Sequence, residues 1–482
     1  MDFEYERCAD LHNQIIRRGW EATGQDWSDY PSATFWDAHP ERHDALSQLA
    51  HPKVVQFWQR ALDSGQAEHD APYQYFLYHV YGLAFPDEFR DMMEIMNVDA
   101  EAEDRFILLY NAASLESHPA GITLDQETGL CIMQMSLWSS EWEDPLLPWQ
   151  PLECILEAYI DMIDAGKVIA ANWRAPGCEP EGGPDVHDPW LVQSWSQHEL
   201  QRTLDAYHHL ITAVERRMPD LEQEQEDQAD DHLAREEDLN QEFYKPGSFV
   251  RAFLLKARNP KKKFLKFIGP RIELPSRPNF RSQPFESARS PDRYADHRPA
   301  PDADEDEKPY IPILLFPATS QNLNHQLSFL SLDAAREQTQ STLKGRNPFP
   351  FFPFASVDNA PAGIYLDPYD PNYWRDHQGT CVLSLPFDLG DGYSRFNDGP
   401  AISSRAAKDW EPANSQLYQA YFNPFITRHH IQLYLILESW AHMVEAGHWD
   451  VDEHGVVGGV EKFREADESA EMAERYSVPL HW

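Results

Sequence analysis

The chain has 482 residues, with 80 acidic and 40 basic side chains and a net charge of −40 at pH 7. A charge of this sign repels nucleic acid phosphates and anionic membranes, which argues against general affinity for either. Five widely spaced cysteines without a Cys-x-x-Cys pair favour free thiols in a reducing compartment. No signal peptide and no apolar run of membrane-spanning length is evident, so we expect an intracellular, most simply a cytoplasmic, protein.

The first part of the chain predicts helices that lead to a short hairpin. Residues 1–65 carry apolar side chains at helical spacing, and a Phe and Met stripe in residues 85–96 predicts a core helix rather than a cofactor site. Residues 106–110 then predict a strand. A hairpin follows, with its turn at residues 126–129.

Two amphipathic helices are predicted after the hairpin, over residues 151–165 and 191–218. Gly166 is placed to cap the first, and Pro219 ends the second.

The middle of the chain has extreme and opposite charges. Residues 220–243 contain eleven acids and one arginine, whereas residues 245–298 contain fourteen Lys or Arg and four Asp or Glu. Basic and apolar side chains alternate in residues 251–268, a pattern found in membrane-surface and nucleic-acid patches. Because the rest of the chain is strongly acidic, we expect this segment to fold back onto the protein itself. Residues 275–309 have little apolar content and predict disorder.

The last part predicts strands at residues 311–316 and 381–385 and a long helix over residues 427–446. A helix over residues 330–343 is a weaker prediction. Residues 450–482 are acidic and expected to be loosely held, apart from short helical stretches.

One segment occurs twice and organises the chain. Residues 113–125 and 355–367 match at eight of thirteen positions, including Pro-Ala-Gly-Ile and a closing Leu-Asp. A Gly-x-Cys follows each copy, and the helices that begin near Ile155 and Ile436 match as well. Three matched blocks in the same order indicate an internal duplication. The structural positions that the repeat marks are Pro119, Gly121, Asp125 and Gly166, and in the second copy Pro361, Gly363, Asp367 and Gly447.

These blocks resemble the SUKH superfamily, which covers fungal cell-wall-assembly regulators and bacterial toxin-immunity proteins. The resemblance rests on a strand ending in Leu-Asp, a glycine-containing hairpin and a closing helix in both halves, and on Phe85-Pro-Asp-Glu-Phe-Arg as an opening helix in the first. It implies an α+β fold with a mostly antiparallel sheet, and a binding scaffold rather than an enzyme.

No pattern predicts a catalytic, cofactor or metal residue. The chain lacks Gly-x-Ser-x-Gly, His-Glu-x-x-His, a phosphate loop and a Rossmann fingerprint. Asp125 and Asp367 fit turn-forming residues better than an acid, a base or a metal ligand. The histidines near the C-terminus, His442, His448 and His454, match no standard zinc spacing.

The sequence therefore predicts two related α+β domains, each a small antiparallel sheet flanked by helices, over residues 1–218 and 310–482. A charged, partly disordered linker is predicted over residues 219–309. The favoured function is a non-enzymatic intracellular scaffold or regulator that binds a protein partner, with no cofactor and no nucleic acid. The alternatives are a hydrolase with a loop-built site, and a peripheral membrane adaptor acting through residues 251–268. The candidate interaction residues are Arg251, Lys256, Lys261, Lys262, Lys263, Phe264, Lys266 and Phe267.

Overall fold

The computed structural model describes most of the chain in segments. These are residues 1–64, 72–78, 80–85, 105–112, 121–134, 149–178, 188–220, 232–286, 311–319, 343–344, 347–349, 354, 357, 360–366, 378–390, 392–396, 401–402, 413–419 and 431–478.

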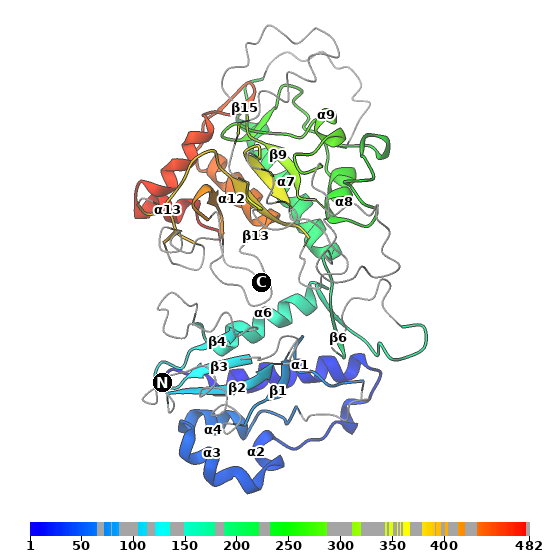
Figure 1. The fold of residues 1–482 in the computed structure, drawn as a ribbon, viewed down its shortest axis with the longest axis vertical. Coiled ribbons are helices and arrows are strands. Elements are labelled where there is room, and N and C mark those ends of the chain that lie inside the picture. The colour runs from blue at the N-terminus through cyan, green and yellow to red at the C-terminus, as the bar shows by residue number, and fades with distance from the viewer. Residues whose placement is uncertain are drawn as a thin grey trace, which may run out of the picture.

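Two separate hydrophobic cores divide the described residues (Figure 1). The first core is built from side chains between Phe3 and Trp190, and the second from side chains between Leu200 and Val478. We call these units the first and the second domain. Each combines helices with small antiparallel sheets, so the predicted α+β class is confirmed.

The first domain begins with helices and closes with a helix on its sheet. Its helices are α1 (Tyr5–Ala22), α2 (Phe35–Ala38), α3 (His43–Leu49), α4 (Pro52–Trp58) and α6 (Leu152–Asp164), with 3-10 turns η1 (Trp27–Asp29) and η2 (Pro40–Arg42). The antiparallel sheet has the order β1 (Val80–Leu83), β2 (Phe106–Ala112), β3 (Gly121–Asp125), β4 (Cys131–Gln134). A separate pair joins β5 (Val168–Ala170) to β6 (Trp190–Val192).

The second domain repeats this plan and adds a small second sheet. Its helices are α7 (Gln197–Arg217), α8 (Phe249–Lys256), α9 (Arg277–Arg281), α12 (Leu433–Glu445) and α13 (Ala470–Tyr476), with 3-10 segments η4 (Glu236–Asp238), η6 (Ala413–Ser415) and η7 (Val460–Asp467). The main sheet joins β9 (Ile313–Pro317), β10 (Gly363–Leu366) and β11 (Thr380–Ser384), and β11 also pairs with β12 (Gln416–Leu417) and β13 (Ile431–Gln432). The second sheet has the order β14 (Val451–Asp452), β15 (Gly455–Val456), β7 (Phe267–Gly269), β8 (Ile272–Glu273), in which β15 and β7 run parallel.

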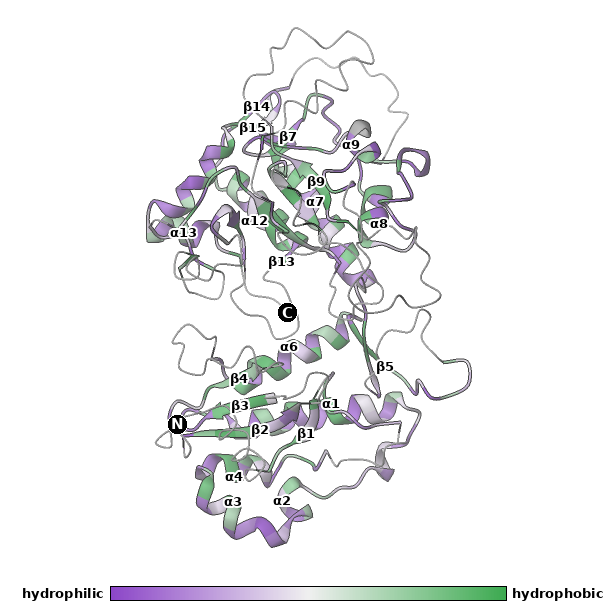
Figure 2. Cartoon of the chain, viewed as in Figure 1, coloured by the Kyte–Doolittle hydropathy of each residue, from purple (hydrophilic) through white to green (hydrophobic). Residues whose placement is uncertain are grey.

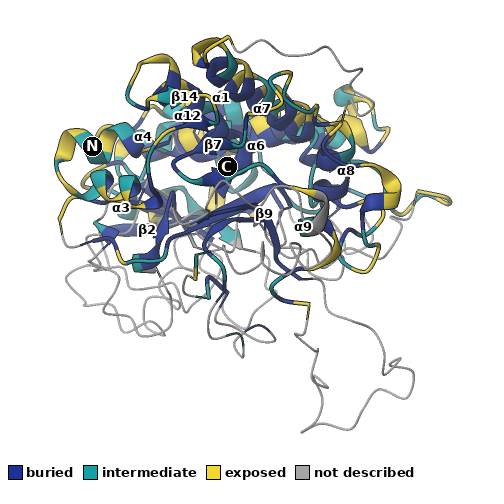
Figure 3. Ribbon diagram, turned by 90° about the horizontal axis from the view of Figure 1, so that it is seen from above, coloured by how far each residue is buried: buried dark blue, intermediate teal, exposed yellow. Residues whose placement is uncertain are grey.

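The long helices lie together on one side of the sheets, as Figure 3 shows from above. Strands β3, β9, β10 and β11 are buried at every residue, including the polar Thr123, Asp125, Thr380 and Ser384. Helix α1 packs against α6, and α7 packs against α12. The apolar stripes of these helices face the sheets and appear green in Figure 2.

The same irregularity interrupts the main sheet of both domains. In the first domain Ile122 pairs with Tyr110 and Thr123 with Leu108, so Leu109 is skipped. In the second, Ile364 pairs with Phe316 and Tyr365 with Leu314, so Leu315 is skipped. Counted from Gly121 and Gly363, the bulge has the same register in both sheets. The following strands also agree, because Cys131 and Cys381 pair with Leu124 and Leu366, the leucines of the Leu-Asp that closes each repeat segment.

The helix pairs carry ion pairs at matching positions. Arg7 and Arg18 of α1 bind Glu157 and Asp164 of α6. Arg202 and His209 of α7 lie against Glu438 and Glu445 of α12, the positions that the repeat aligns with Glu157 and Asp164. Helices α6 and α12 end in the same way, since Gly166 and Gly447 have φ values of 66° and 76° directly after the last turn. The predicted hairpin and closing helix are therefore present in both halves.

Five further positions of the repeat can be placed or set aside. A glycine at the same place in both copies predicts a positive φ at Gly121 or Gly363, or a neighbouring backbone packed close against one of them. Their φ values are 71° and 142°, so φ is positive at both. Pro361 lies just before β10, where it forms a bridge with Lys344. Pro119 and Asp367 lie outside the described residues.

The predicted domain boundaries need correction. Helix α7 was assigned to the first domain, but its buried side chains, from Leu200 to Val214, belong to the second core. Residues 232–286 were assigned to a linker, yet Phe253, Leu254 and Ile268 are fully buried in the same core. The prediction followed the surface charge of this region, whereas its apolar residues decide where it packs.

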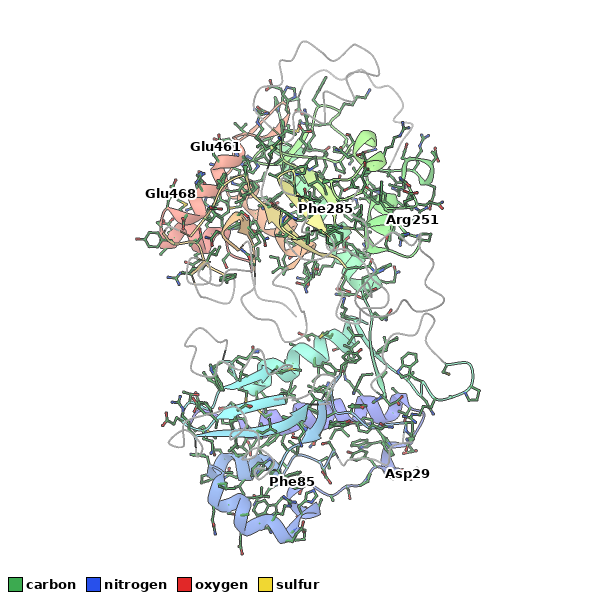
Figure 4. All side chains as sticks on the ribbon, in the orientation of Figure 1. Asp29, Phe85, Arg251, Phe285, Glu461 and Glu468 are labelled. Carbon is green, nitrogen blue, oxygen red and sulfur yellow. The ribbon has the colours of Figure 1, made fainter. Side chains whose placement is uncertain are left out.

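One prediction of weak order is wrong for the residues that the structure describes. Phe280 and Phe285, in the stretch predicted as disordered, are buried at 1% and 0% exposure, and Figure 4 shows Phe285 inside the second domain. In the C-terminal stretch, short helical segments are present as predicted, and Phe463 of η7 and Tyr476 of α13 pack around the buried Trp449. The predicted helices over residues 85–96 and 330–343 lie outside the described residues.

We expect Gly363→Ala to lower the free energy of unfolding by about 3 kcal/mol, because it adds backbone strain and a steric clash. A Cβ at this position would lie 2.4 Å from the carbonyl oxygen of Phe316. Gly447→Ala is the matched control, because its Cβ would meet open space and only the left-handed strain of about 1 kcal/mol remains. Urea unfolding of both variants measures the difference. If both variants lose the same free energy of unfolding, the predicted clash between a Cβ at position 363 and the Phe316 carbonyl oxygen does not destabilise the protein.

Candidate interaction surface

The basic and apolar segment 251–268 contributes buried side chains to the second core. Helix α8 follows the N-cap Ser248, whose hydroxyl accepts a hydrogen bond from the Arg251 backbone N–H. The Arg251 guanidinium is buried, donates to the Tyr244 carbonyl oxygen at 2.9 Å and pairs with Glu236 (Figure 4). The segment therefore folds onto its own protein, as the charge pattern predicts, and Arg251 is not available to a partner.

Three more of the candidate interaction residues serve the fold. Lys262 Nζ donates to the carbonyl oxygen of Met218 at 2.8 Å and lies 3.1 Å from Asp220, which fixes it to the end of α7. Lys266 pairs with Glu273 of β8 at 3.0 Å. Phe267 lies in β7 and is buried.

The remaining candidates form an exposed loop, residues 256–264, which we call the basic loop. Its first part is held because the Arg258 N–H donates to His208 Nε2 at 3.1 Å and Asn259 Nδ2 donates to the His232 carbonyl oxygen at 2.7 Å. Further along, the Lys262 N–H donates to Glu215 Oε1 at 2.9 Å. The side chains that it exposes are Lys256, Arg258, Lys261, Lys263 and Phe264. Phe264 is 50% exposed, the highest value for a large apolar residue in the described part of the chain. A fixed loop thus presents cations around one exposed aromatic ring.

Asp125 forms the hairpin turn, which supports its interpretation as a structural residue. Its carboxylate accepts hydrogen bonds from Arg105, from the Glu127 N–H at 2.9 Å and from the Thr128 hydroxyl at 3.0 Å. Burial alone raises the pKa of Asp125, but these hydrogen bonds outweigh it and lower the pKa below its ordinary value. Because its oxygen atoms are occupied by these donors, Asp125 stays charged and holds the turn.

His12 on α1 is fully buried between three elements. Nδ1 lies 3.0 Å from the Tyr110 hydroxyl on β2, and Nε2 lies 2.9 Å from the Leu62 carbonyl oxygen. The ring stacks on Phe76 with centroids 4.4 Å apart. Burial lowers the pKa of His12 to about 4, so the ring is neutral at pH 7 and ties α1 to the sheet.

A buried ion pair joins the two domains. Lys167, directly after the Gly166 cap of α6, has no exposed surface, and its Nζ lies 3.4 Å from Glu199 in the first turn of α7. Burial lowers the pKa of Lys167 and raises that of Glu199, while their mutual attraction opposes both shifts. Sequence reasoning missed this pair, because its two members belong to separate helices and match no motif.

A small cavity lies between α8 and the ends of β9 and β10. It has about 20 Å³ of space for the centres of water molecules and is lined by Phe243, Lys245, Ser248, Phe249, Val250, Ile311, Ile313, Leu366, Gln378 and Gly379. That space holds one or two waters rather than a substrate, since ligand sites usually enclose about 300 Å³ or more.

The described residues contain no metal site, no disulfide and no membrane-spanning helix. No group of three or more His, Cys, Asp or Glu side chains is arranged to hold a metal ion in that part of the chain. All five cysteines are free thiols, of which Cys8, Cys131 and Cys381 are buried. None of the helices in the described segments is both long and apolar enough to cross a bilayer.

Comparison with models of known protein families, with curated proteins and with solved structures finds no match for this chain.

We expect the stability of the first domain to fall as the pH drops from about 6.5 toward 4. In the unfolded chain His12 has a pKa of about 6.5, so in this range the unfolded state binds a proton that the folded state excludes. When His12 has been fully protonated, the free energy of unfolding has fallen by about 3 kcal/mol. His12→Gln should be less stable than wild type at pH 7 but lack this component of the pH dependence. Unfolding by urea at several pH values measures it, and an identical pH slope for both proteins would contradict the assignment.

Proposed function

We propose that the protein is a non-enzymatic interaction scaffold made of two SUKH-like domains that arose by duplication. The fold supports this proposal through the shared order of a first helix, an antiparallel sheet and a closing helix in both domains. The identical position of the bulge relative to Gly121 and Gly363 also supports common descent, because a bulge is a specific feature that unrelated sheets rarely share at the same register.

The observation that carries the proposal is the exposed Phe264 on the basic loop. Aromatic residues, Phe included, and arginine are enriched at protein interfaces, and the basic loop exposes both Phe264 and Arg258. Arg251 is buried and bonded within the protein, whereas Lys256, Lys261, Lys263 and Phe264 reach the surface. The basic loop is thus the part of the candidate segment suited to an external partner.

The chemistry of the basic loop favours an acidic protein segment that also carries an apolar residue. Lys256, Arg258, Lys261 and Lys263 would attract carboxylates at short range, and Phe264 would receive the apolar side chain. The net charge of −40 opposes such a partner only weakly at physiological ionic strength, because charges more than about 8 Å apart are largely screened. Binding should therefore tighten when moderate salt screens the distant acids and weaken at high salt.

The test compares charge reversal in the loop with charge reversal elsewhere. Lys261→Glu/Lys263→Glu and Phe264→Ala should each lose the partners that wild type retains in quantitative affinity purification from the native cell, by about tenfold or more for a central contact. The matched control is Arg216→Glu/Arg281→Glu, which makes the same change in net charge at two exposed positions outside the loop.

Equal recovery of every partner by all four proteins would refute the role of the basic loop. Co-sedimentation with vesicles separates the membrane alternative. Binding to phosphatidylserine vesicles that is absent with phosphatidylcholine, and lost in Lys261→Glu/Lys263→Glu, would replace the protein partner with an anionic membrane surface.

A further inference from the structure

The segment that connects the two domains is bonded to both of them. The Gln193 N–H donates to the Lys167 carbonyl oxygen at 2.8 Å, and Gln193 Nε2 donates to the Gly166 carbonyl oxygen at 2.9 Å. On the other side, Trp195 Nε1 donates to the Gly247 carbonyl oxygen at 2.9 Å and its ring packs edge-on against Phe249. The connection is therefore not a free linker.

One carbonyl oxygen in this segment links the domains directly. The Ser194 oxygen accepts a hydrogen bond from Lys167 Nζ at 2.7 Å and another from the Gln378 N–H at 2.8 Å. Gln378 precedes β11 of the second domain, and its side chain binds both the Ser194 hydroxyl and the Phe249 N–H. A carbonyl oxygen has two lone pairs, and here each is used by a different domain.

The buried pair of Lys167 and Glu199 completes this junction. Glu199 Oε2 accepts a hydrogen bond from the Ser196 N–H at 2.6 Å, and the Ser196 hydroxyl accepts one from the Glu199 N–H, so the carboxylate also caps α7. Glu199 Oε1 faces Lys167. The buried charges of Lys167 and Glu199 stabilise each other, because the loss of either one would leave the other buried without an opposite charge.

Comparison of the two copies shows that this contact is specific to the junction. The repeat aligns Lys167 with His448, and both residues follow the glycine cap and donate their N–H to a methionine, Met162 or Met443. His448 is only half-buried, and the residues after it, such as Trp449 and Val478, stay in the second core. The two copies therefore differ at the position where Lys167 contacts the other domain.

We propose that Lys167 and Glu199 lock the relative orientation of the two domains, so that the scaffold presents them to partners as one rigid body. The proposal rests on the junction contacts alone and does not depend on what binds the basic loop. Among the described residues, the short segment of residues 193–196 is what still joins the two cores when the pair is removed, so the angle between them should vary.

Distances between spin labels test this lock in the full chain. Labels are placed on Cys154, which is exposed on α6, and at position 470 by Ala470→Cys on α13, in a background with Cys178→Ser. The three other cysteines are buried and do not react under native conditions. We expect one narrow distance distribution for the unaltered junction, and a broader or shifted one for Lys167→Met and for Glu199→Gln. Glu199→Gln keeps a residue that can cap α7, so it removes the charge while preserving the helix start.

Two further variants distinguish a lock from a general loss of stability. Lys167→Met/Glu199→Leu should restore a narrow distribution, because apolar residues of similar volume can replace a buried ion pair. Arg202 lies on α7 like Glu199, but its partly exposed contact is with Glu438 of α12, inside the second domain. Arg202→Met should therefore leave the distance distribution unchanged. If a single variant does not fold, Gln193→Ala takes its place, since it removes one junction bond. Distributions as narrow as wild type in folded Lys167→Met and Glu199→Gln, or in Gln193→Ala where it replaces them, would overturn the proposal.

Discussion

The closing helix of each domain is the constraint on which the fold depends. Nine of the thirteen residues of α12 are buried, so this helix needs the sheet on one side and another helix beside it. Helix α7 supplies that cover for α12, as α1 does for α6. Because α7 precedes the acidic run and α12 lies near the C-terminus, this packing decides where the second domain begins and closes it around everything in between.

Burial also outweighs charge in the basic segment. Residues 251–268 carry cations that pair with nearby acids, but exposed ion pairs contribute about 1 kcal/mol or less. Burial of each large apolar side chain, such as Phe253 or Ile268, contributes about 2 kcal/mol. The apolar residues therefore fix the path of the segment, and the cations follow. Those that meet carboxylates or carbonyl oxygens hold the loop in place, while others remain on its surface around Phe264.

Two features bear on function, of which one is exposed to solvent and the other is buried. The basic loop is exposed and is suited to an acidic partner, so it concerns what the protein binds. The pair of Lys167 and Glu199 is buried and belongs to the junction, so it concerns how the two domains are held while they bind. The basic loop lies outside the parts that the repeat shares, and the pair uses the last position of the repeat, where the second copy has His448. The loop joins α8 to β7, and the pair joins α6 to α7.

The sequence by itself determined the repeated elements, because their signals are local. The hairpin at Asp125, the left-handed glycines at 121 and 363 and the caps at Gly166 and Gly447 each depend on a few adjacent residues, and the structure has all of them in the described segments. Only the tertiary structure decided to which domain α7 belongs. Either core could accept an amphipathic helix, and the choice depends on contacts with α12, more than 200 residues away in the sequence. The same holds for the junction. Lys167 and Glu199 look like surface residues in the sequence, and become a buried pair only because two separately folded domains place them side by side.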